Sequence, residues 1–338
     1  MIRSSSKSGS AGPVTLAVTL GDPRGIGPEI TGRALGIFLE EYPEASVLLL
    51  GDDRHLAEVT QSLPGSRVRT EATGTPGLSS SDLDAGRVSV EAIRRGVAHC
   101  LEGRATALVT GPVHKPSLRA AGVDTPGQTE YLQALTEAPS VGMLMATETS
   151  RVEVPLRILL ATTHLPLRDV AEALTAERLS EQVQLLADGL RRGWGIAEPR
   201  IALCALNPHA SDGGLFGDEE ARILTPVVEA LRASGLRLQG PVPADTVFQK
   251  LLDRDVDGVV VPYHDVGMAV FKTLAFGQGV NVTLGLPFLR TSPDHGTAFD
   301  IAGTGTARAT STLEALRLAA RLGPGLNRVH EGITAGNI

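Results

Sequence analysis

The sequence predicts an α/β protein with a largely parallel sheet, because short strand-like runs alternate with longer amphipathic stretches along the chain. The runs are β-branched or leucine-rich, and a turn rich in Gly, Pro or Asp separates each from the stretch of Ala, Leu, Arg and Glu that follows. The length of 338 residues exceeds what one typical core supports, so we expect two domains with a cleft between them.

The expected strands are the short apolar runs at residues 14–19, 46–50, 107–110, 156–162, 200–206, 258–262 and 280–284. The expected helices are the longer amphipathic stretches at residues 29–40, 89–102, 176–194, 218–234 and 310–321.

No linker marks a domain boundary, so we expect the chain to cross between the domains more than once. We place the first domain at residues 13–135 together with 283–338, and the second at residues 136–282. Residues 1–12 are rich in Ser and Gly and lack the apolar segment of a secretion signal, so a disordered tail is expected there.

The composition excludes several classes of partner. The formal net charge is −7, no basic run stands out and aromatic residues make up only 3%, which argues against nucleic acid and anionic membranes. No apolar run approaches the length of a membrane span. Cys100 and Cys204 lie far apart without CxxC spacing, so we expect neither a disulfide framework nor a thiolate zinc site, and a cytoplasmic location.

Three of the expected strands lead directly to a histidine. His164 follows the run 156–163, His209 follows the run 201–207 and one proline, and His264 follows the run 259–263. Because the carboxyl ends of parallel strands form the ligand-binding edge of such sheets, three imidazoles there can hold a divalent ion and leave positions open for substrate. The alternative is that the histidines belong to separate turns and never meet.

Two basic residues near the C-terminus each follow an apolar run. Lys272 and Arg290 therefore need a partner, and an anionic ligand such as phosphate or carboxylate would serve. The alternative is a structural salt bridge to a nearby aspartate such as Asp294, which His295 follows.

Three further segments carry polar groups. Residues 110–132 are expected to form a long polar loop in which Lys115 and Thr129 can supply donors to an oxyanion. GDPRGIGPEI, residues 21–30, matches no nucleotide-binding fingerprint, so a tight strand-to-helix turn is the favoured interpretation over a phosphate site. Asp245 in GPVPADTVF is a candidate acid or base.

Taken together, these segments resemble the 4-hydroxythreonine-4-phosphate dehydrogenase family from about residue 14 to 322. The resemblance is carried by GDPRGIGPEI, TGPVHKPSLRAAG, QTEYL, ALNPHASDGGLFGDEE, GPVPADTVF, YHDVGMAVFK and VNVTLGLPFLRTSPDHGTAFDIAGTG. It implies two α/β/α domains of the isocitrate and isopropylmalate dehydrogenase type, with the active site in the interdomain cleft. It also implies an obligate homodimer and an oxidation that uses NAD or NADP and one divalent metal ion (Zn, Mg, Co or Mn) per site.

The resemblance also implies roles for particular residues. The metal ligands of the family match three histidines, one of which is expected from the partner subunit: His164, His209 and His264. The substrate-binding positions match Thr129, Lys272, Asn281 and Arg290. Two aspartates match positions near the substrate: Asp245 and Asp265. The resemblance assigns no residues that bind the nicotinamide cofactor.

The sequence departs from the family pattern at three positions. Gln128 replaces the usual histidine before Thr129; its amide still donates a hydrogen bond but carries no charge, so it would hold a phosphate less strongly. Val266 replaces a glutamine, and His114 stands where asparagine is common. The stretches GLFGDEEARILTP and DHGTAFDIA resemble the branch that oxidises phosphorylated four-carbon sugar acids.

We therefore predict oxidation with decarboxylation of a phosphorylated four-carbon β-hydroxy acid, namely 4-hydroxythreonine 4-phosphate as in pyridoxal phosphate biosynthesis. The alternatives are a dehydrogenase for 4-phospho-D-threonate or 4-phospho-D-erythronate, a cis-dihydrodiol dicarboxylate dehydrogenase, a metal-dependent lyase and a non-catalytic sensor. The general base remains open among three residues: Asp245, Asp265 and Lys272.

Overall fold

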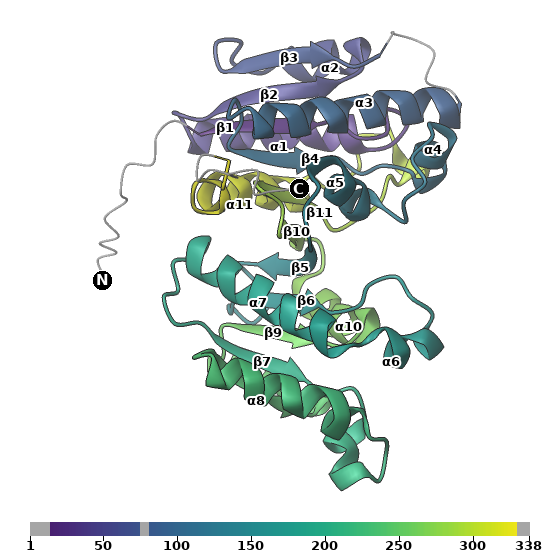
Figure 1. Cartoon of the computed structure of the whole chain (residues 1–338). Coiled ribbons are helices and arrows are strands. Elements are labelled where there is room, and N and C mark those ends of the chain that lie inside the picture. The colour runs from purple at the N-terminus through teal and green to yellow at the C-terminus, as the bar shows by residue number, and fades with distance from the viewer. Residues whose placement is uncertain (1–13, 75–80, 330–338) are drawn as a thin grey trace, which may run out of the picture.

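The computed structural model describes residues 14–74 and 81–329, so the tail predicted at residues 1–12 lies outside the described part. The described chain forms one continuous 11-stranded sheet with helices on both faces (Figure 1). In sheet order the strands are β3 (Val68–Ala72), β2 (Ser46–Gly51), β1 (Thr15–Thr19), β4 (Ala107–Thr110), β11 (Leu289–Pro293), β10 (Val280–Leu284), β5 (Gly142–Thr147), β6 (Leu156–Leu160), β9 (Gly258–Val261), β7 (Arg200–Cys204) and β8 (Arg237–Val242).

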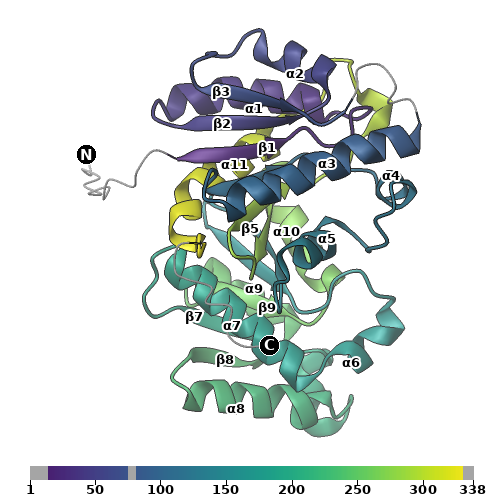
Figure 2. The ribbon, with the colours of Figure 1, turned by 45° about the horizontal axis from the view of Figure 1, so that its top comes forward.

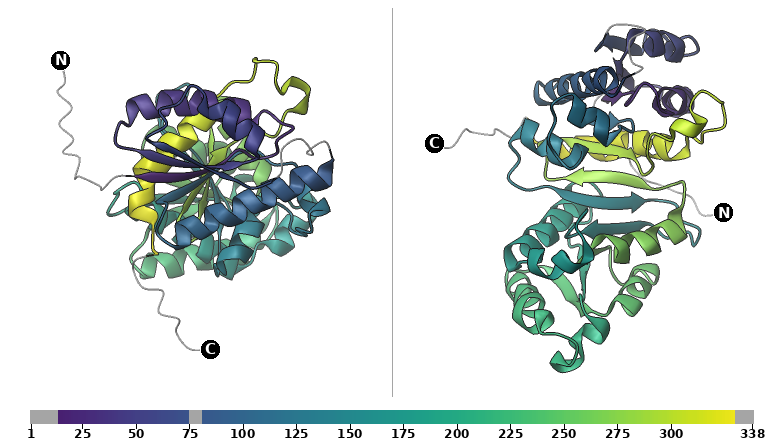
Figure 3. Two further views of the ribbon diagram at one scale, coloured as in Figure 1. Left: turned by 90° about the horizontal axis from the view of Figure 1, so that it is seen from above. Right: turned by 90° about the vertical axis from the view of Figure 1, so that its right-hand side faces the viewer.

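The sheet consists of two parallel groups joined by an antiparallel centre. Strands β3, β2, β1, β4 and β11 run parallel to one another, as do β6, β9, β7 and β8. Between the groups, β10 pairs antiparallel with β11 and with β5, and β5 pairs antiparallel with β6. The strands fan out strongly when the sheet is viewed from above (Figure 3, left), as expected from the twist that accumulates over many strands.

The chain passes from the first strand group to the second once and then returns, and no linker marks either passage. The predicted boundary at 135/136 falls at the end of α5, while the boundary at 282/283 falls inside β10, a strand bonded to neighbours on both sides. The division into domains stays a prediction. No described helix combines the length and apolar character needed to cross a membrane.

Eleven α-helices of the described chain connect and cover the strands (Figure 2). They are α1 (Gly27–Glu41), α2 (Asp53–Thr60), α3 (Asp82–Leu101), α4 (Lys115–Ala120), α5 (Gln128–Thr136), α6 (Val170–Ala173), α7 (Ala176–Arg192), α8 (Thr225–Ala233), α9 (Ala244–Leu252), α10 (His264–Ala275) and α11 (Thr310–Leu326).

Alternate residues of each strand supply the cores on the two faces of the sheet. In β1, Leu16 and Val18 pack with α1 and α11 in a core that continues under α7 and α8. Ala17 points to the other face and packs with Ile93 and Val97 of α3. This two-residue alternation is that of a sheet buried on both faces, which explains why the parallel strands read as continuous apolar runs.

All seven expected strands are present, and the largely parallel α/β class is confirmed. Four strands had no clear sequence signal. Two are edge strands with polar residues, β3 (VRTEA) and β8 (RLQGPV), β5 (GMLMAT) is poor in β-branched residues, and β11 (LRTSP) contains an arginine and a proline.

The helix predictions require three corrections. Helix α3 begins at Asp82 rather than residue 89, because the Ser81 side chain caps it by accepting from the N–H of Asp84. The stretch 218–234 contains a π-helical turn (Glu220–Leu224) before α8. The loop expected at residues 110–132 is wrong, since it contains α4 and the start of α5, which are too short to show a clear helical period.

Candidate functional site

A cavity of about 370 Å³ lies where the two strand groups meet. Segments that follow the carboxyl ends of four parallel strands form its walls, as expected for this class of sheet. These are Gly111–Val113 after β4, Thr163 and His164 after β6, His264 after β9, and Asp294–Gly296 after β11. The central antiparallel strands contribute Met143 and Met145 of β5 and Asn281 of β10.

Arg290 is a buried cation that borders this cavity. It is only 2% exposed, and its guanidinium donates to Thr110 Oγ1 at 2.7 and 3.0 Å and to Thr283 Oγ1 at 3.2 Å. Burial lowers the pKa of Arg290 to about 10, against an opposing effect of Glu130, so it remains protonated at neutral pH. No carboxylate in the described chain forms an ion pair with it, so an anion in the cavity would supply the missing charge.

Lys272 differs from Arg290 because it has a carboxylate partner. Its Nζ lies 2.7 Å from Oδ2 of Asp294 and 2.9 Å from the backbone oxygen of the same residue. The carboxylate of Asp294 is almost fully buried and borders the cavity, whereas Lys272 does not line it. The salt-bridge alternative therefore applies to Lys272 in this structure, and its substrate role stays a prediction.

The first turn of α5 presents polar groups to the cavity. Gly127 is its N-cap, and the wall continues through Gln128, Thr129 and Glu130, so the unpaired N–H groups of a helix start lie at the cavity. Gln128 Nε2 donates to Gly111 O at 3.4 Å, while its Oε1 is buried without a donor among the described residues.

Asn281, like Gln128, has an unpaired amide oxygen: its Oδ1 is buried at the cavity and accepts no hydrogen bond from a described residue. Buried acceptors are normally paired, so both amide oxygens fit a ligand that carries hydroxyl or amino donors. Thr129 and Arg290 complete the substrate positions that the sequence predicts at this cavity.

Two of the three predicted metal ligands lie side by side. The rings of His164 and His264 are 5.4 Å apart between centroids, and both line the cavity. His264 Nδ1 lies 2.7 Å from Oδ1 of Asp265, which fixes the ring. Burial, with the nearby charges of Lys115 and His264, lowers the pKa of His164 and favours its neutral, ligating form. This pair of nitrogen donors fits a divalent transition metal such as zinc or cobalt.

The third predicted ligand, His209, does not line this cavity. It is exposed on the stretch Pro208–Gly214 that follows β7. No group of three His, Cys, Asp or Glu residues in the described chain is arranged to hold a metal ion. The three histidines follow the neighbouring strands β6, β9 and β7, but in the described chain only His164 and His264 come together at the cavity, and a site of three histidines stays a prediction.

The three candidate bases lie at different places relative to the cavity, and none of them lines it. Asp265 is highly exposed and contacts His264, and Lys272 is bound to Asp294 as described. Asp245 lies exposed in the first turn of α9, outside the cavity. Because β7 and β8 are parallel neighbours, Asp245 and His209 follow adjacent strand ends on the same edge of the sheet.

Several residues that line the cavity had no predicted role, among them Glu130, Ser292 and His295. His295 Nε2 is buried without a described partner. Only their position could have indicated a role, because Ser292 and His295 stand at or just after the end of β11. The sequence did not indicate this strand.

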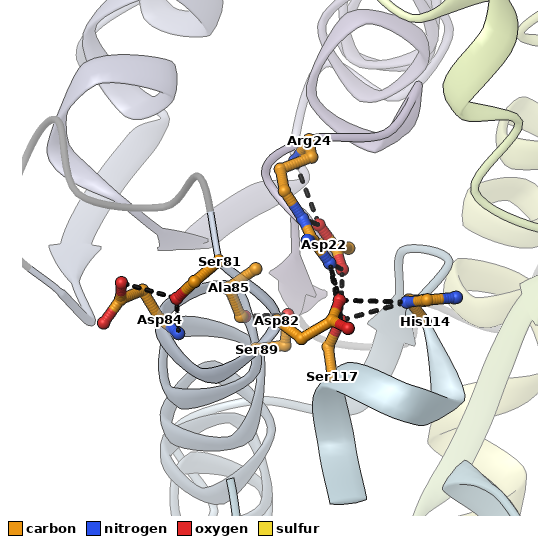
Figure 4. A network of polar contacts seen from close by, with 9 residues as sticks. All are labelled: Asp22, Arg24, Ser81, Asp82, Asp84, Ala85, Ser89, His114 and Ser117. Carbon is orange, nitrogen blue, oxygen red and sulfur yellow. Dashed lines mark hydrogen bonds and ion pairs between the residues drawn. The ribbon is translucent and has the colours of Figure 1, made fainter. Parts of the chain in front are cut away.

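The glycine-rich turn 21–27 packs against segments that form two walls of the cavity. Asp22, fully buried, accepts from Arg24 at 2.9 Å and from Ser117 Oγ at 3.1 Å (Figure 4). Arg24 also donates to Asp82 at 2.8 Å, so the network links the β1–α1 turn to the starts of α3 and α4. His114, at one of the departures from the family pattern, belongs to this network through Ser117 Oγ at 3.2 Å.

The backbone of this turn is occupied by protein contacts. The N–H of Asp22 donates to Pro112 O at 2.9 Å, and that of Ile26 donates to Thr297 O at 2.9 Å. At Gly21, where φ is +80°, a Cβ would lie 2.3 Å from Pro112 O, so only glycine allows this approach. The segment is therefore the tight strand-to-helix turn that the sequence favours, and it contacts the segments that form two cavity walls.

Comparisons with known proteins agree with this architecture. The family described as pyridoxal phosphate biosynthetic protein PdxA matches residues 46–319. The crystal structure of a 4-hydroxythreonine-4-phosphate dehydrogenase from Klebsiella pneumoniae is 37% identical and has a TM-score of 0.77, over 92% of this chain and 99% of that one. A terephthalate 1,2-cis-dihydrodiol dehydrogenase from Burkholderia xenovorans LB400 is 26% identical, with a TM-score of 0.65 over 91% and 98%.

A β-decarboxylating dehydrogenase from Thermococcus kodakarensis shares the fold at 17% identity and a TM-score of 0.50, over 92% of this chain and 84% of that one. The predicted fold class is thereby confirmed, as is the prediction of a dehydrogenase. The chain therefore belongs to the PdxA family of pyridoxal phosphate biosynthetic proteins.

Proposed function

We propose that this chain catalyses the metal-dependent, NAD(P)-linked oxidation and decarboxylation of 4-hydroxythreonine 4-phosphate. One observation carries the proposal: a buried cation without a carboxylate partner, Arg290, borders the same cavity as the imidazole pair His164 and His264. A phosphorylated hydroxy acid has groups for both ends of such a site. The family and the name of the Klebsiella structure support the same substrate.

Arg290 holds the anionic end of the substrate in this proposal. Its guanidinium is already fixed by Thr110 and Thr283, so little side-chain freedom is lost on binding. The N–H groups at the start of α5 and the hydroxyl of Thr129 add donors. Gln128 and Asn281 offer their free amide oxygens to donors on the substrate.

The reacting end of the substrate lies at the imidazole pair. A divalent ion held by His164, His264 and His209 of the partner subunit would act as a Lewis acid on the hydroxyl and carboxylate. Asp265 keeps His264 oriented for this purpose. The proton acceptor is one of Asp245, Asp265 and Lys272, and Asp245 can serve only if a partner brings it to the cavity together with His209.

The proposal includes a homodimer with its active sites at the subunit interface, and the position of His209 outside the cavity supports it. Large apolar side chains are exposed beside both parts of the proposed metal site. Leu165 and Leu167, next to His164, are 44% and 67% exposed, and Leu215 and Phe216, after His209, are 71% and 45% exposed. Exposed apolar groups clustered at functional residues are typical of a protein interface.

The test is a substrate panel measured by reduced-nicotinamide absorbance, with NAD and NADP and with Zn²⁺, Mg²⁺, Co²⁺ and Mn²⁺. The proposal expects the highest kcat/KM for 4-hydroxythreonine 4-phosphate. A higher value for 4-phosphothreonate or 4-phosphoerythronate would overturn the substrate. Product formation without any nicotinamide reduction would overturn the oxidation and favour a lyase.

A further inference from the structure

The stretch that carries His209 has a backbone that isolated peptides avoid. His209, Ala210, Ser211 and Asp212 have φ values of 52°, 54°, 69° and 44°, and Gly213 follows at 71°. Four consecutive residues with a Cβ in the left-handed region are sterically disfavoured, so other parts of the protein must hold them there.

One buried carboxylate supplies that restraint. Glu220 is 3% exposed, and its Oε1 accepts from the N–H groups of Leu206 at 2.9 Å and Asn207 at 2.7 Å. Its Oε2 accepts from Asn207 Nδ2 at 2.9 Å and from the hydroxyl of buried Ser211. The two oxygens thus hold both the entry to the left-handed stretch and its middle.

Glu220 is firmly anchored but has no cation of its own. It begins the π-helical turn before α8, where Ile223 and Leu224 are buried in the main core. No lysine or arginine of the described residues forms an ion pair with it. Its four hydrogen bonds all go to the stretch 206–211, so this buried charge is devoted to that stretch.

We propose that Glu220 is a positioning residue. It holds the backbone of His209 in the conformation that binds the metal ion before His209 enters the cavity of the partner subunit. The inference rests on the proposed function, in which His209 completes the metal site of the partner subunit. His209 itself is exposed and is presented by a backbone that is constrained two residues away. Preorganised ligands bind a metal more tightly because less order is lost on binding.

The test compares variants of the whole chain, assembled as the proposed dimer and titrated with Co²⁺ alone. Glu220→Gln keeps the side-chain shape but leaves only one acceptor oxygen, so we expect Co²⁺ affinity to fall about 10- to 100-fold, as for other groups that orient ligands. Ser211→Ala removes one of the four bonds and should weaken binding less, in the same direction. Asp218→Ala is the matched control, because Asp218 is exposed two positions earlier and contacts only Arg222.

A second measurement separates positioning from general damage. The affinity for inorganic phosphate, which we assign to Arg290, should be unchanged in Glu220→Gln, and thermal unfolding should remain cooperative. If Glu220→Gln does not fold, the Co²⁺ and phosphate affinities of Ser211→Ala test the inference instead. Weakened Co²⁺ binding with normal phosphate binding supports the inference.

His209→Ala tells the two proposals apart. Loss of Co²⁺ binding in His209→Ala together with wild-type binding in Glu220→Gln and Ser211→Ala would overturn the positioning role alone. Wild-type Co²⁺ binding in His209→Ala would overturn the ligand assignment, and the positioning role with it.

Discussion

The proposed anion end of the cavity and its proposed metal end are built in different ways. Arg290 sits on a central strand, is fixed by two threonine hydroxyls and lies within one chain. The metal end has only two imidazoles, and the residue proposed to complete it stands on an exposed loop outside the cavity. In the proposed site, strands alone preorganise the buried charge, whereas the ligand expected to reach another subunit stands on a restrained loop.

Substitution of Arg290 should damage the anion end and leave the metal end intact. We expect Arg290→Ala to lower kcat/KM by about three orders of magnitude, because a buried charge that pairs with the substrate is worth several kcal/mol. The kcat/KM of Arg290→Lys should lie between the values of Arg290→Ala and the wild type, since an ammonium keeps the charge but cannot reproduce the guanidinium fork. Steady-state kinetics measure the loss, and unchanged Co²⁺ affinity is the control. A kcat/KM within threefold of wild type would remove Arg290 from the site.

The network behind the anion end should matter for stability. Asp22→Asn removes the fully buried charge that holds Arg24, while Arg24 keeps its more exposed partner Asp82. We expect the free energy of unfolding to fall by about 2 kcal/mol, below the range for a fully buried pair, because Arg24 is partly exposed. Urea unfolding measures this, with Asp84→Asn, at the solvent-exposed start of α3, as the control. Equal stability of Asp22→Asn and Asp84→Asn would contradict the account.

Substitution of Gln128 should change substrate binding at the anion end less than substitution of Arg290 does. Gln128→His restores the residue that the family usually carries, and an imidazolium can form an ion pair with phosphate, whereas the uncharged amide can only donate a hydrogen bond. We expect KM for the phosphorylated substrate to fall about threefold to tenfold at pH 6, with less effect at pH 8, where the imidazole is neutral. Thr129→Ser is a matched control at the next residue. A KM that does not respond to pH in this variant would show that phosphate lies elsewhere.

The sequence revealed those parts of the fold and site that depend on local patterns. Buried parallel strands such as β1 and β4 are apolar throughout and were expected at nearly their observed bounds. Edge strand β3 was not expected because it is polar and mostly exposed, and β11 was not expected because it contains an arginine and a proline although it is fully buried. His164 and His264 were brought together by strand topology, which the periodicity indicated.

Other features could not be predicted because they depend on tertiary contacts. The proposed role of Glu220 rests on hydrogen bonds to a loop nine or more residues earlier, and nothing in GDEEAR distinguishes it from the exposed Asp218. His209 follows β7, the direct neighbour of β9, so strand order does not separate it from His264; the separation arises in the stretch Pro208–Gly214. The family resemblance supplied the expectation of a partner's contribution, which strand patterns do not contain.

The most direct test of the central claim, a metal site shared between subunits, is complementation between two inactive variants. His164→Ala lacks a cavity ligand, and His209→Ala lacks the residue donated to the partner. When equal amounts are mixed and allowed to exchange subunits, each mixed dimer regains one intact site, so we predict about one quarter of wild-type activity and Co²⁺ binding. If His209 served its own subunit, every site in the mixture would remain defective and no activity would return, which would contradict the account.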